Sequence, residues 1–389
     1  MVSAELILRS EGASLSSERS VKRAQTMERQ EILQWLREES NAALETLWSR
    51  ADETRRCAVG DEVYLRGLIE FSNFCINNCA YCGLRVDNRT NRRYRMPEEE
   101  ILDAAQKAAS LGYGTIVLQS GNDPYNTDAW VAELVRKIKR TANIAVTLSL
   151  GEQAFETLAL WREAGADRYL LRFETSDVRL FRRIHPSNCG EGHIRITLLQ
   201  WLAELGYEIG GGMMVGLPGQ SYESLAADLE ICAQLDLDMI GIGPYIAHRE
   251  TPLGRQAANY VLPPDQQVPN TETMACKALA LARLMRPDAN IPATTALATA
   301  DKANGLAHGL TRGANIVMPN VTPIHYRRHY VIYPDRYSEV MDPDSHYRYV
   351  VDALSALGRP IGKGPGASPA LARKGNGFKA ADGGPGGDV

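Results

Sequence analysis

The chain lacks the features of a membrane protein, a nucleic-acid-binding protein and a disulfide-bonded secreted protein. No run of about 18 apolar residues occurs, so a membrane-spanning helix is excluded, and the N-terminus has no signal-peptide pattern. Basic residues show no excess, because 43 Lys and Arg stand against 47 Asp and Glu. The cysteines form one cluster and otherwise occur singly. We therefore expect a monomeric cytoplasmic protein with neither nucleic acid nor membrane as a partner.

Histidine is absent before His185, which limits the metal ligands available near the clustered cysteines. Cys75, Cys79 and Cys82 follow an apolar run at C-x3-C-x2-C spacing, and Tyr81 precedes the last of them. A structural zinc site needs four closed ligands, and iron–sulfur clusters are usually held by four cysteines. Three thiolates therefore favour a [4Fe-4S] cluster with one iron open to a small molecule, with structural zinc as the alternative.

The pattern after the cysteines predicts a parallel sheet. An amphipathic segment of helical length, a turn and a short apolar run recur along the chain, as in the turn at 110–114 followed by the apolar run 115–119. Glycine often ends helices, and helices that alternate with short buried strands form parallel sheets. With further strands near 63–72, 144–149 and 292–295, eight strand–helix units result, which close most simply into a (βα)8 TIM barrel. An open six-strand partial barrel with an appended domain is the alternative.

Composition also predicts how the chain is divided. Ile32 and Leu36 begin a helical pattern of apolar residues that precedes the barrel. From Gly358 onward the chain holds ten of its 33 glycines and a single aromatic residue, Phe378, which is too little to build a core. The expected parts are a disordered segment over 1–18, N-terminal helices over 19–60, the barrel over 61–357 and a disordered tail over 358–389.

Polar residues collect where the predicted strands end, which is where (βα)8 barrels place their active sites. Arg172 and Glu174 are two apart on the fourth predicted strand, so both would face the interior. Such a pair either closes the barrel as a structural salt bridge or serves a charged ligand. The other polar residues at strand ends are Glu70, Ser72, Gln119, Ser120, Asn122, Thr147, Ser149, Glu152, Thr294, Thr295 and Asn320.

The cysteine triplet with Tyr81 resembles the signature of the radical S-adenosylmethionine (SAM) enzymes. SAM carries a carboxylate, an ammonium group, a sulfonium and an adenosine. Arg195 can supply a cation, Glu174 an acceptor and the Gly-rich run 210–219 a closely approaching backbone. The Gly-rich run also fits a phosphate loop, although it lacks the Gly-Lys-Ser/Thr ending.

Several of these residues have a purely structural alternative. Thr294 and Thr295 could pack a strand end, and Met214 and Met318 could fill the core. The segment 325–333, rich in Tyr and His, could line the barrel mouth or form a helix face, and periodicity does not decide between the two.

Longer motifs resemble one family within that superfamily. Gly165-Ala-Asp-Arg-Tyr-Leu-Leu-Arg172 and Asn290-Ile-Pro-Ala-Thr-Thr295 are the more specific ones, whereas the cysteine triplet marks only the superfamily. Over about residues 30–357 the chain resembles the HydE family, the radical SAM maturases of [FeFe]-hydrogenase, whose relatives include biotin synthase and methylornithine synthase. The other resembling segments are 66–75, 81–85, 94–96, 115–121, 214–220, 241–244 and 318–320.

The resemblance implies a full (βα)8 barrel around an internal cavity, and it implies roles for named residues. The cluster ligands would be Cys75, Cys79 and Cys82. The SAM contacts would be Tyr81, Gln119, Ser120, Gly121, Ser149, Glu174, Arg195 and Met214. The substrate contacts would be Arg172, Thr294, Thr295, Met318, Tyr330 and Tyr333.

Two positions depart from the family pattern. Many members carry further cysteines after the eighth strand for an accessory cluster, but 333–350 contains none, so we expect one cluster only. Asn122 stands where the family commonly has an acid, which argues against a carboxylate role at that position.

The activity implied is reductive cleavage of SAM to a 5′-deoxyadenosyl radical. The radical would act on an organometallic iron–cysteine precursor supplied by a partner maturase, with electrons from a low-potential donor. One alternative is a rearrangement like that of methylornithine synthase, which needs an acceptor for a lysine ammonium opposite Arg172. Another is a non-catalytic iron–sulfur carrier or scaffold. Biotin synthase chemistry is disfavoured because Cys189, Cys232 and Cys276 fall in a loop or on predicted helices.

Overall fold

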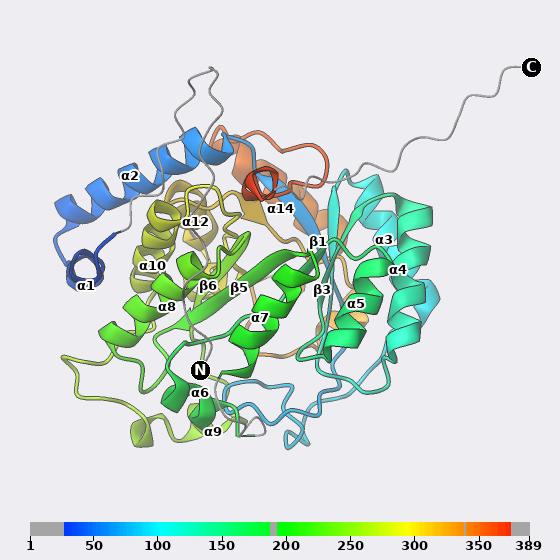
Figure 1. Cartoon of the computed structure of the whole chain (residues 1–389), viewed down its shortest axis with the longest axis horizontal. Helices are drawn as coiled ribbons and strands as arrows, with labels where there is room; N and C mark the ends of the chain where they lie inside the picture. Colours follow the sequence, from blue (N-terminus) through cyan, green and yellow to red (C-terminus); the bar gives the residue numbers. More distant parts are fainter. Residues whose placement is uncertain (1–26, 187–192, 338–339, 375–389) are drawn as a thin grey trace, which may run out of the picture.

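Parallel strands wrapped by helices form the body of the protein. The computed structural model describes residues 27–186, 193–337 and 340–374. Within them, a seven-stranded parallel sheet has the order β6-β5-β4-β3-β2-β1-β7, and helices lie outside it (Figure 1). The strands are β1 (Tyr64–Ser72), β2 (Thr115–Ser120), β3 (Ala145–Ser149), β4 (Arg168–Leu170), β5 (Glu208–Val215), β6 (Met239–Pro244) and β7 (Ile316–Val317). The predicted alternation of strand and helix is confirmed, and the arrangement is TIM-barrel-like.

The helices each bury one apolar stripe. In α4, Val131, Leu134 and Ile138 are buried, and the Thr127 hydroxyl caps the first turn by accepting from the Trp130 amide. The main helices are α1 (Arg29–Arg37), α2 (Asn41–Val59), α3 (Glu98–Ser110), α4 (Asp128–Ala142), α5 (Phe155–Glu163), α6 (Val178–Ile184), α7 (Ile194–Glu204), α8 (Tyr222–Gln234), α10 (Glu272–Met285) and α14 (Pro343–Ala356). The shorter ones are α9 (Pro252–Arg255), α11 (Thr295–Ala300), α12 (Gly305–Thr311), α13 (Ile324–Arg327) and α15 (Ala370–Arg373).

The two helices that precede the sheet are α1 and α2, which lie beside α8 and α10 (Figure 1). The Lys277 ammonium, on α10, donates to the Leu36 carbonyl at 3.2 Å and so pairs with the free carbonyl end of α1. Among the helices of the described ranges, none combines the length and hydropathy that crossing a membrane requires.

An irregular segment replaces the strand predicted near 292–295. Asn290 and Pro292 form isolated parallel bridges to Met239 of β6 and Ile316 of β7, so the segment lies between the two edges of the sheet. Proline has no amide hydrogen, which prevents a regular ladder here. The predicted extension of this strand to Thr295 is wrong, because the Thr294 hydroxyl caps α11 and Thr295 is already helical.

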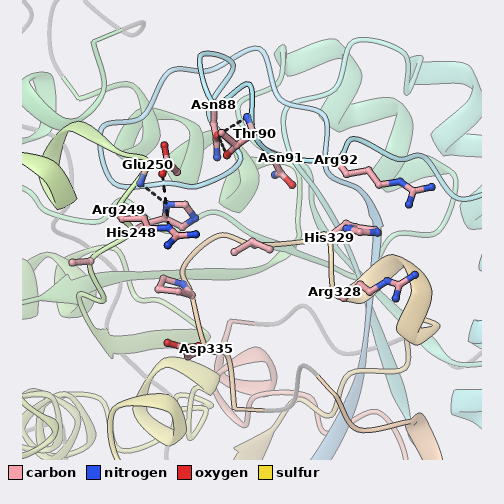
Figure 2. Close-up of a pocket in the computed structure, with 13 residues that line it drawn as sticks. Asn88, Thr90, Asn91, Arg92, His248, Arg249, Glu250, Arg328, His329 and Asp335 are labelled. Carbon is pink, nitrogen blue, oxygen red and sulfur yellow. Dashed lines mark hydrogen bonds and ion pairs between the residues drawn. The ribbon is translucent and has the colours of Figure 1, made fainter.

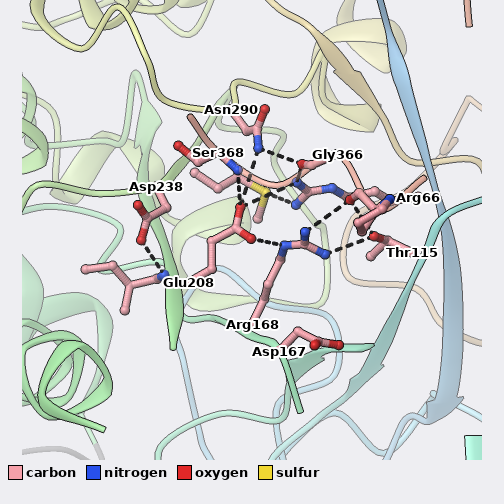
Figure 3. Close-up of polar contacts among 12 residues, drawn as sticks. Arg66, Thr115, Asp167, Arg168, Glu208, Asp238, Asn290, Gly366 and Ser368 are labelled. Atoms are coloured by element: carbon pink, nitrogen blue, oxygen red, sulfur yellow. Dashed lines mark hydrogen bonds and ion pairs between the residues drawn. The ribbon is translucent and has the colours of Figure 1, made fainter. Parts of the chain in front are cut away.

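The end of the sheet at which the strands begin is covered by residues 360–374, which we call the C-terminal strap. The Pro365 carbonyl accepts from Arg168 at 3.1 Å and from Thr115 at 2.8 Å. The Gly366 carbonyl accepts from Arg66 and from Asn290, both at 3.0 Å (Figure 3). Arg66 and Arg168 are almost fully buried, so the strap supplies acceptors that buried guanidinium groups need.

The expectation of disorder from Gly358 onward is therefore wrong for residues 358–374. Composition shows a shortage of apolar side chains there, but it does not show that backbone carbonyls of this segment pair with charges inside the sheet. The Ser368 amide also donates to Glu208 at 2.9 Å, which anchors the strap at a third point. Residues 1–18 and 375–389, for which disorder was also predicted, lie outside the described residues.

We expect Gly114→Ala to displace the strap. A Cβ at Gly114 would lie 1.7 Å from the Gly364 carbonyl oxygen, and overpacking of this kind costs about 1–3 kcal/mol. Urea denaturation should show the loss of stability, and trypsin should cleave faster at Arg373 and Lys374. Ser110→Ala, at the exposed end of α3, is the control. Unchanged stability and cleavage in the glycine variant would mean that the strap is not packed against this position.

Candidate functional site

The three clustered cysteines lie in the loop between β1 and α3, residues 73–97, which we call the cysteine loop. It joins the other loops that follow the strands, together with α6 and α9, toward the bottom of the view in Figure 1. One side chain holds much of its path. Arg93 donates to the carbonyls of Asn73 at 2.5 Å, Leu84 at 2.9 Å and Arg85 at 2.8 Å. The loop therefore has a fixed conformation that its own residues maintain.

Gly121, at the end of β2, lets the cysteine loop pass closely. A Cβ there would lie 2.2 Å from the Phe74 carbonyl oxygen and 2.7 Å from the Cys75 side chain. The Ile76 amide also donates to the Asn122 carbonyl at 2.9 Å. Gly121, predicted as a SAM contact, thus has a clear packing reason to be glycine.

The three thiols lie in a largely buried setting. Cys79 is 9% exposed, and Cys75 and Cys82 are half-buried. Burial raises the pKa of each thiol, to about 12 for Cys79. Backbone amides of Asn77 and Asn122 donate toward Cys75 and act in the opposite direction. A bound metal must displace the thiol protons, because the thiolate is the ligand.

The donor set fits a cluster better than a single ion. Among the described residues, no three His, Cys, Asp or Glu side chains converge on a point that one metal ion could occupy. A [4Fe-4S] cluster is wider than an ion, and each cysteine binds a different iron, so the sulfur atoms stand further apart. The other described cysteines, Cys57, Cys232 and Cys276, are on α2, α8 and α10. Cys189 lies outside the described residues.

Arg195, at the start of α7, joins the cysteine loop to the strand ends. Its Nε donates to Glu152 at 2.7 Å, and its Nη1 donates to the Arg172 carbonyl at 2.8 Å and lies 3.8 Å from Glu174. Glu152 also accepts from the Asn77 side chain at 2.9 Å, within the cysteine loop. Burial opposes charge on Glu152, but the Arg195 guanidinium outweighs it and lowers the pKa of that carboxyl.

Arg172 and Glu174 meet as predicted, although β4 ends at Leu170 and the predicted fourth strand is longer than the observed one. Arg172 Nη2 lies 2.9 Å from Glu174 and donates to the Met213 carbonyl at 3.0 Å. Glu174 has φ of +67°, a conformation uncommon for any residue with a side chain. The Arg172 Nε is buried and has no hydrogen-bond partner in the described part of the chain, which leaves a donor for an anionic ligand.

Residues 328–336 form a cover over the strand ends. The Gln119 side chain donates to the Tyr330 hydroxyl at 3.2 Å, and Arg336 pairs with Glu70 of β1 at 2.8 Å. Tyr333 is within electrostatic reach of both Arg172 and Arg336. The part of the Tyr- and His-rich segment from Arg328 onward therefore lies at the mouth of the sheet, and its earlier part forms the short helix α13.

Tyr81 is positioned by His185, a residue that no sequence motif marks as part of the site. The Tyr81 hydroxyl lies 2.9 Å from His185 Nε2, and His185 Nδ1 lies 3.1 Å from the Phe181 carbonyl. Since a carbonyl can only accept, Nδ1 carries the hydrogen and Nε2 accepts from Tyr81. Met214 lies in the same apolar cluster as Tyr81.

The remaining predicted residues differ in how available they are. The Thr294 hydroxyl is committed, because it donates to the Ile242 carbonyl at 2.9 Å and caps α11. The Ser120 hydroxyl donates to the Gly121 carbonyl at 2.6 Å. Three other predicted residues are half-buried: Ser149 ends β3, Thr295 begins α11 and Met318 follows β7.

Two further positioning groups were missed. Asp123 accepts from Ser72 at 2.6 Å and pairs with Arg95 at 2.8 Å. It follows Asn122, the position at which an acid is common in the family. Arg336 and Glu70 are 266 residues apart. A strand-end carboxylate signals a need for a cation, but nothing local to Glu70 shows which arginine supplies it.

A pocket of ≈ 690 Å³ opens on the outer side of the cysteine loop (Figure 2). No residue predicted to contact the cluster, SAM or substrate lines it. Its walls come from the cysteine loop, the loop after β6 and the cover at 328–336, and they include Asn88, Arg92, His248, Arg249, Arg328 and Val331. The pocket is therefore next to the site described above and distinct from it.

Known proteins resemble this chain over most of its length. Residues 69–232 match the Radical SAM superfamily. The chain is 45% identical to the [FeFe] hydrogenase maturase subunit HydE of Thermotoga maritima over 82% of its own length and 87% of that protein. It is 31% identical to the 3-methylornithine synthase of Methanosarcina acetivorans over 82% of its length and 86% of that protein. The crystal structure of methylornithine synthase (PylB) superimposes with a TM-score of 0.72 at 25% identity, covering 86% of this chain and 94% of that one.

The fold, the cysteine loop and these matches define a radical SAM enzyme, a class that uses a [4Fe-4S] cluster and SAM. Within that class, the chain belongs to the HydE family. The resemblance stated from the sequence motifs is confirmed.

Proposed function

We propose that this protein cleaves SAM reductively and acts on an organometallic iron–cysteine precursor during assembly of the diiron site of [FeFe]-hydrogenase. The identity to HydE of Thermotoga maritima supports this activity. The single observation that carries it is the continuous network from Asn77 through Glu152, Arg195 and Glu174 to Arg172. The network connects the cysteine loop to a guanidinium that retains an unpaired donor.

In this proposal Cys75, Cys79 and Cys82 hold one [4Fe-4S] cluster. When bound, the cluster supplies the electron that splits SAM into methionine and the 5′-deoxyadenosyl radical. No accessory cluster is proposed, since 333–350 lacks cysteine and Cys232 and Cys276 lie on helices. The sheet would close into a (βα)8 barrel through the segment 290–293, whose bridges reach both edge strands.

The protein's own residues orient SAM in this proposal. Glu174 accepts from the SAM ammonium, and Arg195, 3.8 Å away, holds Glu174 in place. Tyr81, fixed by His185, would face the adenosine. Gln119, Ser120, Gly121, Ser149 and Met214 would complete the contacts around it.

Substrate would lie below SAM, between the strand ends and the cover at 328–336. Arg172 would donate its free Nε to an anionic or amino-acid-like group. The other proposed contacts are Thr294, Thr295, Met318, Tyr330 and Tyr333. Because the Thr294 hydroxyl is already committed, its contact would be made through its methyl group. Other hydrogenase maturases would supply the precursor and accept the product.

A rearrangement like that of methylornithine synthase is the second candidate, favoured by the 31% identity and the TM-score of 0.72. It needs an acidic acceptor for a lysine ammonium. Glu70 is the buried carboxylate at the end of β1, but it already pairs with Arg336 and accepts from Asn320 at 2.8 Å. This pairing favours the maturase activity.

A non-catalytic cluster carrier is the third candidate. A carrier needs exposed ligands for transfer, whereas Cys79 is 9% exposed and the Arg195 network has no purpose in transfer. Anaerobic reconstitution followed by an assay for 5′-deoxyadenosine separates the two classes. Absence of SAM cleavage under dithionite would exclude the enzyme.

We expect Arg172→Ala to keep the cluster and uncoupled SAM cleavage while product formation falls by at least about tenfold, because a charged hydrogen bond to substrate is worth about 1.5–3 kcal/mol. Cluster absorption, 5′-deoxyadenosine and product are measured on the same sample. Arg348→Ala, at an exposed position on α14, is the control. If Arg172→Ala fails to fold, Arg172 has the structural salt-bridge role.

A further inference from the structure

The pocket on the outer side of the cysteine loop lies one residue from a proposed cluster ligand. Gly83 follows Cys82, and its amide donates to the Ile332 carbonyl at 2.9 Å. Its carbonyl accepts from the Asn88 side chain, which lines the pocket, at 2.7 Å. A Cβ at Gly83 would lie 2.1 Å from the Val331 carbonyl oxygen and 2.7 Å from the His248 ring. The floor of the pocket is therefore in direct contact with the backbone that continues from Cys82.

The rim of this pocket is more basic than the chain as a whole. Arg92, Arg249 and Arg328 line it, whereas the formal net charge of the chain is −4. Figure 2 places Arg92 and Arg328 on one side of the pocket and Arg249 on the other. The carboxylates at the pocket are Glu250 and Asp335, and Glu250 pairs with Arg255 outside the pocket and also lies 3.8 Å from Arg249 of the rim. Three arginines therefore stand against two carboxylates, one of which is shared with Arg255, so the rim keeps an excess of positive charge.

The three arginines reach into solvent instead of converging on a point. The Arg249 side chain is 92% exposed, and Arg92 and Arg328 are exposed as well. A small anion is bound by donors that meet around it in a buried setting. Exposed, separated guanidinium groups around a hollow suit the acidic surface of a protein that inserts a protruding edge.

We propose that this pocket is the docking surface for an acidic one-electron carrier protein that reduces the cluster. The proposal rests on the proposed function, since SAM cleavage consumes one electron for each SAM. The reduced carrier loses one electron at its own centre, the cluster gains it, and no proton or group is transferred. The backbone of Gly83 and the Asn88 side chain lie between the pocket and Cys82. A carrier docked here is therefore next to the backbone that leads directly to a cluster ligand.

The test reverses the charge of the rim with Arg92→Glu, Arg249→Glu and Arg328→Glu in one variant. The reconstituted enzyme is assayed for 5′-deoxyadenosine with dithionite, with a reduced acidic ferredoxin and with a reduced flavodoxin. We expect the rate with either carrier to fall by about tenfold or more, because rim charges govern association. We expect the dithionite rate to stay unchanged, because dithionite is small and needs no docking.

Binding gives a second readout that does not depend on turnover. Calorimetric titration of the reconstituted protein with each carrier should show a dissociation constant about tenfold weaker in the triple variant. For the natural sequence, raising the salt from about 50 to about 300 mM should weaken binding, and the variant should lose this dependence. If only one carrier responds, that carrier is the partner.

The matched control is Arg50→Glu, Arg140→Glu and Arg348→Glu, exposed positions on α2, α4 and α14 that give the same change in net charge. If the carrier-driven rate falls equally in this control, the effect is due to overall charge and the docking surface is overturned. Carrier-driven rates and affinities that stay unchanged in the rim variant would overturn it as well. A fall in maturation with the other maturases, at unchanged carrier-driven SAM cleavage, would assign the pocket to a maturase and also overturn the proposal. If the triple variant loses its dithionite rate, Arg92→Glu and Arg328→Glu are tested singly by the same criteria. Absence of dithionite-driven cleavage in the natural sequence overturns the proposed function instead.

Discussion

Cys79→Ala should give a protein that folds but neither holds a [4Fe-4S] cluster nor cleaves SAM. Cys79 is the most buried of the three cysteines, and burial keeps its thiol protonated until a metal takes the proton's place. With two thiolates left, the loop cannot hold three corners of a cluster. After anaerobic reconstitution, the visible absorption and the electron paramagnetic resonance signal of the cluster should be missing, and 5′-deoxyadenosine should stay at background.

Cys232→Ala is the matched control for this experiment. Cys232 is also buried, but it lies on α8 and away from the cysteine loop. Its replacement should cost a modest amount of stability through a small cavity and leave the cluster intact. A normal cluster in Cys79→Ala would show that the proposed ligands are wrong, whatever the activity.

Arg195→Gln should be the most damaging replacement outside the cysteines. The arginine pairs with Glu152 and lies near Glu174, and all three side chains are largely buried. Removing one partner of a buried ion pair costs about 3–5 kcal/mol, because the remaining charge is left without compensation. Urea denaturation of the natural protein and the variant should show this difference, and calorimetric titration should show loss of SAM binding.

The pH dependence of that difference gives an independent check. With Arg195 present, the pKa of Glu152 is lowered, so its contribution to stability is present above its unfolded pKa of about 4.3 and is lost as pH falls through the lower folded value. Without Arg195, burial, which raises the pKa of Glu152, is opposed only by hydrogen bonds such as the one from Asn77, so the variant is penalised most at high pH. We therefore expect the stability deficit to be smaller at about pH 5.5 than at about pH 7.5. A deficit independent of pH would mean that Glu152 is not the group left unpaired.

Arg140→Gln provides the comparison for the stability measurement. Arg140 forms an exposed pair with Glu133, at 3.1 Å, and exposed pairs contribute about 0.2–1 kcal/mol. The variant should therefore differ little from the natural protein at either pH. A loss as large as that of Arg195→Gln would point to a general sensitivity of the helices to lost charge.

Most of the fold could be predicted because its signals are local. A buried strand such as β2 is a short apolar run, and an outer helix such as α4 has a period of apolar residues, so both appear within a few residues of sequence. The prediction of a strand near 292–295 was wrong because the conformation of the segment 290–293 depends on Pro292 and on the two edge strands that it bridges, β6 and β7. The prediction of disorder for the C-terminal strap was wrong because the strap is held by Arg66, Arg168 and Glu208, which come from three different strands.

The candidate site divides in the same way. The spacing of Cys75, Cys79 and Cys82 indicates a cluster by itself, and the family motifs lead to Glu174 and Arg195. The pair of Glu70 and Arg336 brings together opposite ends of the main fold, and no local pattern connects them. His185 is likewise defined by what it contacts, since its neighbours in sequence do not point to Tyr81.

The cover at 328–336 belongs to two surfaces at once. Tyr330 contacts Gln119 on the inside, and Arg328 and Val331 face the outer pocket. A molecule that shifts this segment from one side therefore changes the affinity of the other side for its own ligand. Thermodynamic linkage is reciprocal, so any preference of an electron carrier for the substrate-loaded enzyme equals the preference of substrate for the carrier-bound enzyme. Reducing power would then be delivered preferentially to molecules that are ready to use it.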